Sequence, residues 1–197
     1  MYKEKFSEYL EDLAEKLPAP GGGSASGLVA CLGIALLEMS CNFTVGKPKY
    51  KEVEAEIKEI LEKLVSLRGR LEELIDEDVF SYQELSLAYR LKEKEKIQSA
   101  LKKAIEVPLK ICGFSLEGLR LSKIILEKAN PNLITDTGGG VLFLTAGFNS
   151  AELNVRINLK NLKDRELLKK IQQSLKEQSE EVKEIKEKIL KKVYCRL

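Results

Sequence analysis

The chain has 197 residues, of which 44% are hydrophobic and 32% charged, a composition that indicates one soluble globular domain over residues 1–197 and argues against disorder. Its formal net charge of +2 gives no support to nucleic-acid binding. Histidine is absent, which excludes Ser-His-Asp triads, Cys-His dyads and histidine-based zinc or iron sites. Any proton transfer must therefore use carboxylate, lysine, tyrosine, cysteine or water.

The first segment predicts an amphipathic helix over residues 2–17, because its apolar residues recur at three- and four-residue steps before Pro18 and Pro20. This stretch has no basic start followed by an apolar core, so it resembles neither a secretory signal nor a transit peptide. We expect a cytoplasmic protein.

A glycine run follows the prolines and precedes a helix predicted over about 24–45; the run and the residue after it are Gly21, Gly22, Gly23 and Ser24. Glycine permits positive φ or close backbone approach, and a serine can cap a helix whose first N–H groups then point at an anion. A plain helix-capping turn explains the same residues, and the run alone leaves both interpretations open. The pattern is weak evidence for a nucleotide-binding phosphate loop, because neither the preceding strand nor the motif lysine is present.

The helix over 24–45 is apolar enough to suggest a membrane span, but polar residues such as Glu38 and Asn42 interrupt it. We therefore expect a buried helix and no membrane contact. Small residues recur four apart in this helix, at Ser26 and Ala30 and at Gly27 and Cys31, a spacing that lets another helix approach closely.

Three further long helical stretches belong to an expected all-α bundle of about six or seven helices. Residues 49–90 carry a heptad stripe, for which an isolated coiled coil is the alternative to a bundle. Residues 95–128 contain Pro108, which predicts a kink rather than an end. Residues 164–195 carry interleaved charges, which favour a solvated helix face over a nucleic-acid patch.

Between the last two of these stretches, Asn130-Pro131-Asn132 predicts a turn, and Asp136 is placed to cap the helix that follows. The VLFLTAGF segment in that helix is open to misreading as a strand, but small residues and then Asn154 and Asn158 favour a helix lined for contact. The two asparagines are one turn apart, so they share one helix face.

Two charged groups stand out as candidates for chemistry. Asp76 and Asp78 sit among apolar residues, so at least one is expected to point toward a packed interior, where desolvation raises a carboxyl pKa; we prefer Asp78. From the residues alone, an exposed acidic helix turn is the plainer interpretation. Lys47 follows the apolar helix, where a cation is favoured by the helix dipole whether or not it has a further role.

Four motifs in order resemble the formiminotetrahydrofolate cyclodeaminase and methenyltetrahydrofolate cyclohydrolase family. They are PAPGGGSASGLVACLGIALLEMSCNFTVGKP at 18–48, LEELIDEDVFSYQEL at 71–85, A-x-x-V-P-L at 104–109 and ANPNLITDTGGGVLFLTAGFNSAELNVRINL at 129–159. The chain departs from relatives at Gly138–Gly140 and at Ala129, where bulkier residues and a glycine, respectively, are common. The resemblance covers most of the chain.

The resemblance implies an enzyme that acts on a one-carbon unit bound to tetrahydrofolate, with the folate as substrate and no separate cofactor. Cyclodeaminase activity, which releases ammonia from 5-formiminotetrahydrofolate, is the first expectation, and methenyltetrahydrofolate cyclohydrolase activity is the alternative. In these reactions Asp78, Lys47 and Asp136 are the candidate catalytic groups. Gly21–Ser24, Asn154 and Asn158 are the candidate substrate-binding groups, with the glycine run and Ser24 holding the glutamate tail or polar edge.

Two expectations concern assembly and class. The resemblance and the small-residue helices predict a homodimer, with the site near the subunit interface. No Asp, Glu or Cys cluster has convincing ligand spacing, so we expect no metal. A non-catalytic helical bundle that dimerises through its small-residue faces is the competing hypothesis from another class.

Overall fold

All regular structure in the described part of the chain, residues 6–197 of a computed structural model, is helical. The all-α prediction is confirmed. The helices are α1 (Phe6–Ala14), α2 (Gly22–Asn42), α3 (Glu54–Leu91), α4 (Lys94–Lys128), α5 (Ile134–Leu159) and α6 (Arg165–Tyr194), with short 3-10 turns η1 (Pro48–Tyr50) and η2 (Pro131–Leu133). The predicted start of the first helix, residues 2–5, lies outside the described residues.

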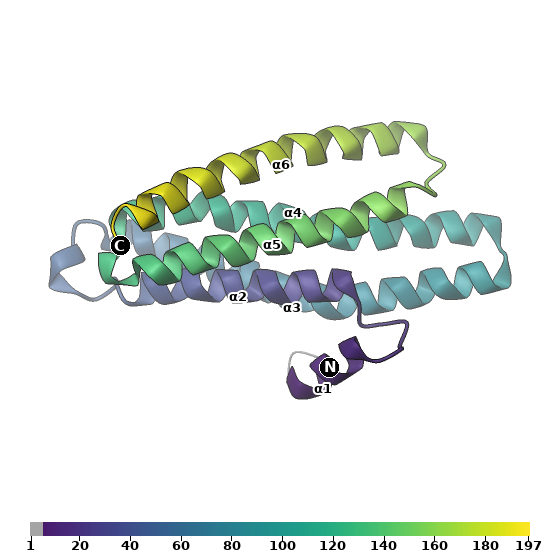
Figure 1. The fold of residues 1–197 in the computed structure, drawn as a ribbon, viewed down its shortest axis with the longest axis horizontal. Coiled ribbons are helices and arrows are strands. Elements are labelled where there is room, and N and C mark those ends of the chain that lie inside the picture. The colour runs from purple at the N-terminus through teal and green to yellow at the C-terminus, as the bar shows by residue number, and fades with distance from the viewer. Residues whose placement is uncertain (1–5) are drawn as a thin grey trace.

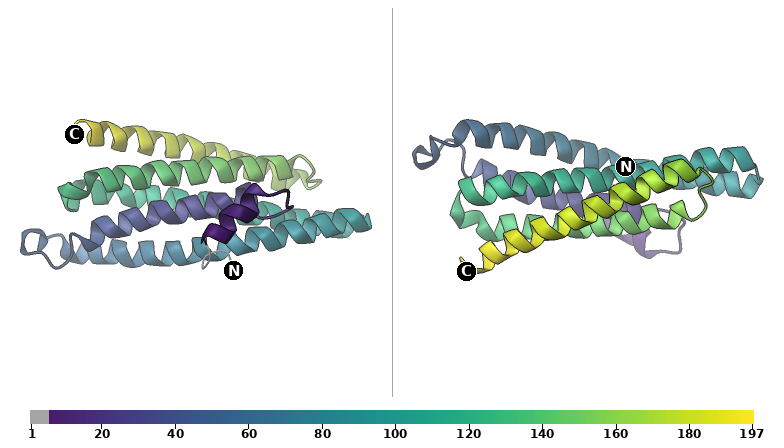
Figure 2. Two further views of the ribbon diagram at one scale, coloured as in Figure 1. Left: turned by 60° about the horizontal axis from the view of Figure 1, so that its bottom comes forward. Right: turned by 90° about the horizontal axis from the view of Figure 1, so that it is seen from above.

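Helices α2 to α5 form an up-and-down bundle in which each long helix runs back along the one before it (Figure 1). Helix α2 packs against α3 and α5, α4 packs against the same two helices, and α6 covers α4 and α5. Helix α1 stands beside the N-terminal half of α2, as the left view of Figure 2 shows, and Tyr9 of α1 contacts Ser24 of α2. The C-terminus lies at the opposite end of the bundle from the start of α2 (Figure 1).

The heptad stripe of α3 faces this bundle, which decides against an isolated coiled coil. Its apolar positions are buried in the shared core: Ile57, Ile60, Leu64, Leu67, Leu71 and Leu74. Helix α4 runs through Pro108 without ending, as predicted. Residues 141–148, the segment open to misreading as a strand, lie inside α5.

Helix α2 alone among the described helices has the length and apolar content to cross a membrane. Of its most apolar window, 56% is buried inside the bundle, and the core helix of a soluble protein meets the same two criteria. Its apolar side chains therefore have a structural explanation in packing against α3 and α5.

Glycines let α2 and α5 approach until their backbones nearly touch. A Cβ atom at Gly33 would lie 2.8 Å from the Leu144 Cγ and 2.9 Å from the Gly140 carbonyl oxygen. One at Gly147 would lie 3.1 Å from the Ala30 Cβ. The predicted close approach at Ser26 and Ala30 is thus confirmed, with the glycines of α5 as its other side.

We predict that Gly33→Ala lowers the free energy of unfolding by about 1–3 kcal/mol, because the added methyl group overpacks a backbone contact. Gly113→Ala is the matched control, since a Cβ at Gly113 in α4 meets nothing within 4 Å. That change should stabilise the protein by up to about 1 kcal/mol through helix propensity. Urea unfolding of both variants measures the difference, and equal effects at the two positions would contradict the packing argument.

Candidate active site

A cavity of about 190 Å³ opens where the start of α2 meets α3, α4 and α5. The segment before α2 and these three helices each contribute to its wall, so groups far apart in the sequence converge there. The lining residues are Pro18, Ala19, Gly21, Gly22, Gly23, Asp78, Ser81, Tyr82, Leu85, Ala104, Asn154, Ile157 and Asn158. Six of the nine candidate residues lie in this wall.

Asp78 projects from α3 onto the glycine run. Its Oδ2 accepts a hydrogen bond of 2.8 Å from the backbone N–H of Ser24. A Cβ atom at Gly23 would lie only 2.1 Å from the Asp78 Oδ1, so no larger residue fits there while the carboxylate keeps this position. Close approach, rather than positive φ, is therefore the reason for Gly23.

The surroundings of Asp78 tune its acidity. Burial raises the pKa of the Asp78 carboxyl above its ordinary value of 3.8, and the hydrogen bond from the Ser24 N–H works against that rise. A carboxylate with a raised pKa at a cavity wall is a candidate general base or acid. The expectation that one aspartate of this pair faces a packed interior holds for Asp78.

Ser24 has a different role from the predicted one. Helix α2 begins at Gly22, and its N-cap is the extended Gly21, which has no side chain to cap with. The Ser24 N–H donates a hydrogen bond to Asp78. The Ser24 side chain is buried beside Tyr9 and does not line the cavity. The prediction of a Ser24 cap with an N–H free for an anion was wrong, because a carboxylate of the protein itself takes that position.

Tyr9 is the residue at this site that sequence reasoning missed. It belongs to α1, is only 1% exposed, and places its hydroxyl 3.1 Å from the Ser24 Oγ. Burial raises the pKa of the Tyr9 hydroxyl, the Ser24 hydrogen bond lowers it, and the charge of Asp78 raises it further. Its place in the apolar stripe of the first helix predicts burial but not this polar neighbour.

Asn154 and Asn158 present one face of α5 to the cavity, as their spacing predicts. The Asn154 Nδ2 donates to the Ser150 carbonyl at 2.9 Å, and the Asn158 Nδ2 donates to the Ala104 carbonyl at 2.9 Å. These bonds fix the orientation of both amides. Neither amide oxygen accepts a hydrogen bond from residues 6–197, so both are available to donors on a ligand.

Lys47 and Asp136 do not belong to this cavity. Lys47 follows the C-terminal end of α2, and Asp136 lies in the first turn of α5, whereas the cavity is at the opposite ends of both helices. The length of α2 puts about 30 Å between the two ends. Asp136 also does not cap α5, whose N-cap is Leu133. Within one chain, Lys47 and Asp136 therefore lie apart from Asp78, and their catalytic roles stay predictions.

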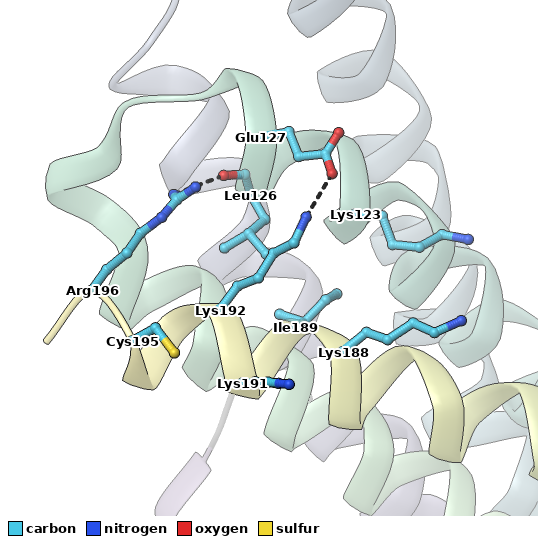
Figure 3. A pocket seen from close by; sticks show the side chains of 9 residues that line it. All are labelled: Lys123, Leu126, Glu127, Lys188, Ile189, Lys191, Lys192, Cys195 and Arg196. Atoms are coloured by element: carbon cyan, nitrogen blue, oxygen red, sulfur yellow. Dashed lines mark hydrogen bonds and ion pairs between the residues drawn. The ribbon is translucent and has the colours of Figure 1, made fainter.

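A larger groove of about 580 Å³ lies away from this site, between the C-terminal ends of α4 and α6 (Figure 3). Its rim is basic, but two of its cations are already engaged: Lys192 pairs with Glu127 at 2.9 Å, and Arg196 donates to the Leu126 carbonyl. Cations near two helix C-termini are also stabilised by the helix dipoles. The smaller cavity is the stronger candidate, because it holds a partly buried carboxyl with a raised pKa and oriented polar groups.

Comparison with known proteins identifies the family of the chain. A methenyltetrahydrofolate cyclohydrolase from Methylorubrum extorquens is 44% identical over 171 residues, which cover 82% of each chain. A formimidoyltransferase-cyclodeaminase from Dictyostelium discoideum is 30% identical over 93% of this chain, but the match spans only 34% of that longer protein.

A solved structure has the same fold. The crystal structure of formiminotetrahydrofolate cyclodeaminase from Thermotoga maritima superimposes with a TM-score of 0.93 at 29% identity and covers 96% of both chains. The family model for formiminotransferase-cyclodeaminase matches residues 5–177, which is most of the sequence. The chain therefore belongs to the formiminotransferase-cyclodeaminase family.

Proposed function

We propose that this chain is a methenyltetrahydrofolate cyclohydrolase, which adds water to 5,10-methenyltetrahydrofolate and yields 10-formyltetrahydrofolate. Family membership makes it an enzyme acting on folate one-carbon derivatives. The observation that carries the proposal is Asp78, a partly buried carboxylate with a raised pKa at the wall of a cavity. The 44% identity to a cyclohydrolase, higher than the 23–30% to the curated formimidoyltransferase-cyclodeaminases, supports this reaction over its sister.

The Asp78 carboxylate supplies the proton transfers that this hydrolysis needs. As a water oxygen bonds to the cationic methenyl carbon, one water proton passes to Asp78, which gives a neutral hydroxyl adduct. The bond from that carbon to N5 then breaks as the proton passes from Asp78 to N5. The hydroxyl proton leaves to solvent as the formyl carbonyl forms, so that one proton is released overall. The proposed sequence involves proton transfer only, with folate as substrate.

The cavity accommodates one end of a folate. Its volume of about 190 Å³ is below the roughly 300–1,000 Å³ of sites that enclose a whole drug-sized ligand. We place the pterin end inside, where the amide oxygens of Asn154 and Asn158 accept from its amino-pyrimidine N–H groups. The bare backbone of Gly21–Gly23 lets the ring approach closely, and the aminobenzoyl-glutamate end extends outward past the exposed ring of Tyr82.

Cyclodeaminase activity, the first expectation from the family resemblance, is the second candidate. The structural similarity to the Thermotoga maritima cyclodeaminase supports it. In that reaction N10 attacks the formimino carbon on N5, and ammonia leaves after it accepts a proton. Both reactions pass through a tetrahedral carbon at the same place, so Asp78 and the two asparagines would serve either.

We also propose a cytoplasmic homodimer that buries one face of α2 and α5. On this face, large apolar side chains are 38–68% exposed and recur at helical spacing; they are Leu32, Met39, Phe43, Leu142, Phe143, Leu153 and Ile157. We call this set the α2/α5 face. Exposed apolar surface of this extent is typical of a protein interface, and two adjacent helices suit an isologous contact with a second copy.

The first prediction for function concerns turnover. The protein should accelerate loss of 5,10-methenyltetrahydrofolate absorbance above its spontaneous hydrolysis, with no ammonia released from 5-formiminotetrahydrofolate. Asp78→Asn should lower kcat by about 100- to 10,000-fold. Ammonia release without methenyl hydrolysis would replace this proposal by the cyclodeaminase one, and failure of either substrate to react would favour the non-catalytic bundle.

A second prediction follows from the pKa of Asp78. Burial raises the pKa of Asp78 in the folded state, so the folded protein binds this proton more tightly than the unfolded chain does. The resulting stabilisation is fully present below about pH 4, the pKa of an unfolded aspartate, and is lost as pH rises through the raised folded-state pKa. The free energy of unfolding of wild type relative to Asp78→Asn should therefore fall as pH rises through this range. Urea unfolding of both proteins at several pH values measures the difference, and a pH-independent difference would show that Asp78 titrates normally.

A third prediction concerns the subunit contact. Leu142→Glu should convert the dimer to a monomer in sedimentation velocity, because it places a charge at the centre of the α2/α5 face. Leu87→Glu is the control, since Leu87 is 52% exposed on α3 but lies outside that face. A wild-type monomer, or a Leu142→Glu dimer, would rule out this interface.

A further inference from the structure

The cavity and the α2/α5 face share an edge. Ile157 belongs to both, so a second copy seated on this face would lie beside the cavity mouth. Within the described cavity wall, Asp78 is the one charged side chain, and no lysine or arginine accompanies it. The described wall therefore holds no cation that could donate a hydrogen bond to a substrate oxygen or to the attacking water.

The opposite edge of the same face carries a cation. The Lys47 ammonium lies 5.4 Å from the centroid of the Phe43 ring, and Phe43 is the last apolar residue of the α2/α5 face. Lys47 is exposed and makes no ion pair with any residue from 6 to 197. One edge of the face therefore has a carboxylate without a cation, and the other has a cation without a carboxylate.

A twofold axis through the middle of the face brings these two edges together. Ser26 lies beside Ser150 and Ser40 beside Thr137, so Leu32 and Leu142 stand at about the same level, midway along α2 and α5. From that level the face extends about 16 Å to Phe43 and about 22 Å in the other direction to Ile157. An axis perpendicular to the helices at Leu32 and Leu142 thus sets Phe43 of each copy near Ile157 of the other.

Charge decides between this antiparallel arrangement and a parallel one. If the axis ran along the helices, the edges next to Asp78 in the two copies would lie side by side. The two edges that carry Lys47 would also lie side by side. With the axis perpendicular, each carboxylate edge receives a lysine and the two α2 dipoles run in opposite directions. Opposite charges across an interface favour the correct orientation over the wrong one.

We infer that the active site is completed across the dimer interface, with the partner subunit's Lys47 as the cationic group beside Asp78. This inference rests on the folate reaction and the dimer proposed above. In hydrolysis, the partner subunit's Lys47 donates a hydrogen bond to the attacking water oxygen and then to the hydroxyl of the adduct. Asp78 moves the proton. The lysine assigned from the sequence thus acts in the site of the other subunit.

Complementation between two inactive variants tests this arrangement. Asp78→Asn and Lys47→Met homodimers should each lose at least about 100-fold in kcat. A heterodimer purified with two different tags, one carrying Asp78→Asn and the other Lys47→Met, should recover about half of the wild-type rate per dimer. One of its two sites contains both substitutions, and the other contains neither.

The control is a heterodimer of wild type with the Asp78→Asn/Lys47→Met double variant. Each of its shared sites would carry one defect, so it should remain inactive, whereas sites confined to one chain would leave it half active. The inference is overturned if the complementing heterodimer stays inactive, if the control heterodimer is half active, or if Lys47→Met turns over at the wild-type rate.

A crosslinking measurement separates failure of this inference from failure of the proposed reaction. In a Cys195→Ser background, which removes the exposed native thiol, Phe43→Cys chains mixed with Ile157→Cys chains should be joined by a short bismaleimide. Either variant alone should not be joined, because its two thiols lie far apart in an antiparallel dimer. Crosslinks within either single variant would show the parallel dimer and overturn the inference. Mixed crosslinks in a protein that turns over neither folate would reject the proposed function and leave the antiparallel dimer standing.

Discussion

The contact between α2 and α5 is the constraint on which the rest of the structure depends. Gly33 and Gly140 let the two backbones approach, and hydroxyl contacts at Ser26–Ser150 and Ser40–Thr137 set the register along the helices. That register brings the glycine run at the start of α2 level with the asparagines near the end of α5. Helices α3 and α4 pack on the inner side of this pair and supply Asp78 and the floor of the cavity, while the outer side remains apolar and exposed.

Periodicity made the helices predictable, because each buried stripe repeats at helical spacing over many residues. The apolar stripe of α3 predicted the long helix. The small residues of α2 predicted a closely packed neighbouring helix but did not identify it as α5. Asp78, Asn154 and Asn158 were found as members of motifs, and the fold then brought them together. What the sequence did not indicate is the side chain that meets each glycine: Gly23 is opposite Asp78 only because α3 crosses the start of α2 at that residue.

Tertiary contacts explain where the structure differs from the expectations drawn from residue type. Ser24 has the residue type of a cap, but Gly21 already occupies the N-cap position and Asp78 takes the Ser24 N–H. Asp136 also has the type of a cap, yet η2 runs directly into α5 and leaves it one turn inside. Lys47 and Asp78 were assigned to one site because both lie in family motifs, and membership of a motif says nothing about the distance between two residues. In one chain they are at opposite ends of a bundle, and only a second chain can bring such groups together.

The contact between Gly23 and Asp78 also limits how the sequence can diverge. Because a Cβ at position 23 would occupy the space of the Asp78 carboxylate, a larger residue there requires a shorter or withdrawn side chain at position 78. The constraint between these two positions, 55 residues apart in the chain, runs in one direction. A lineage that keeps the acid in this position must keep the glycine, whereas one that loses the acid is free to keep or to replace the glycine, so a larger residue at position 23 indicates that the carboxylate no longer occupies this place.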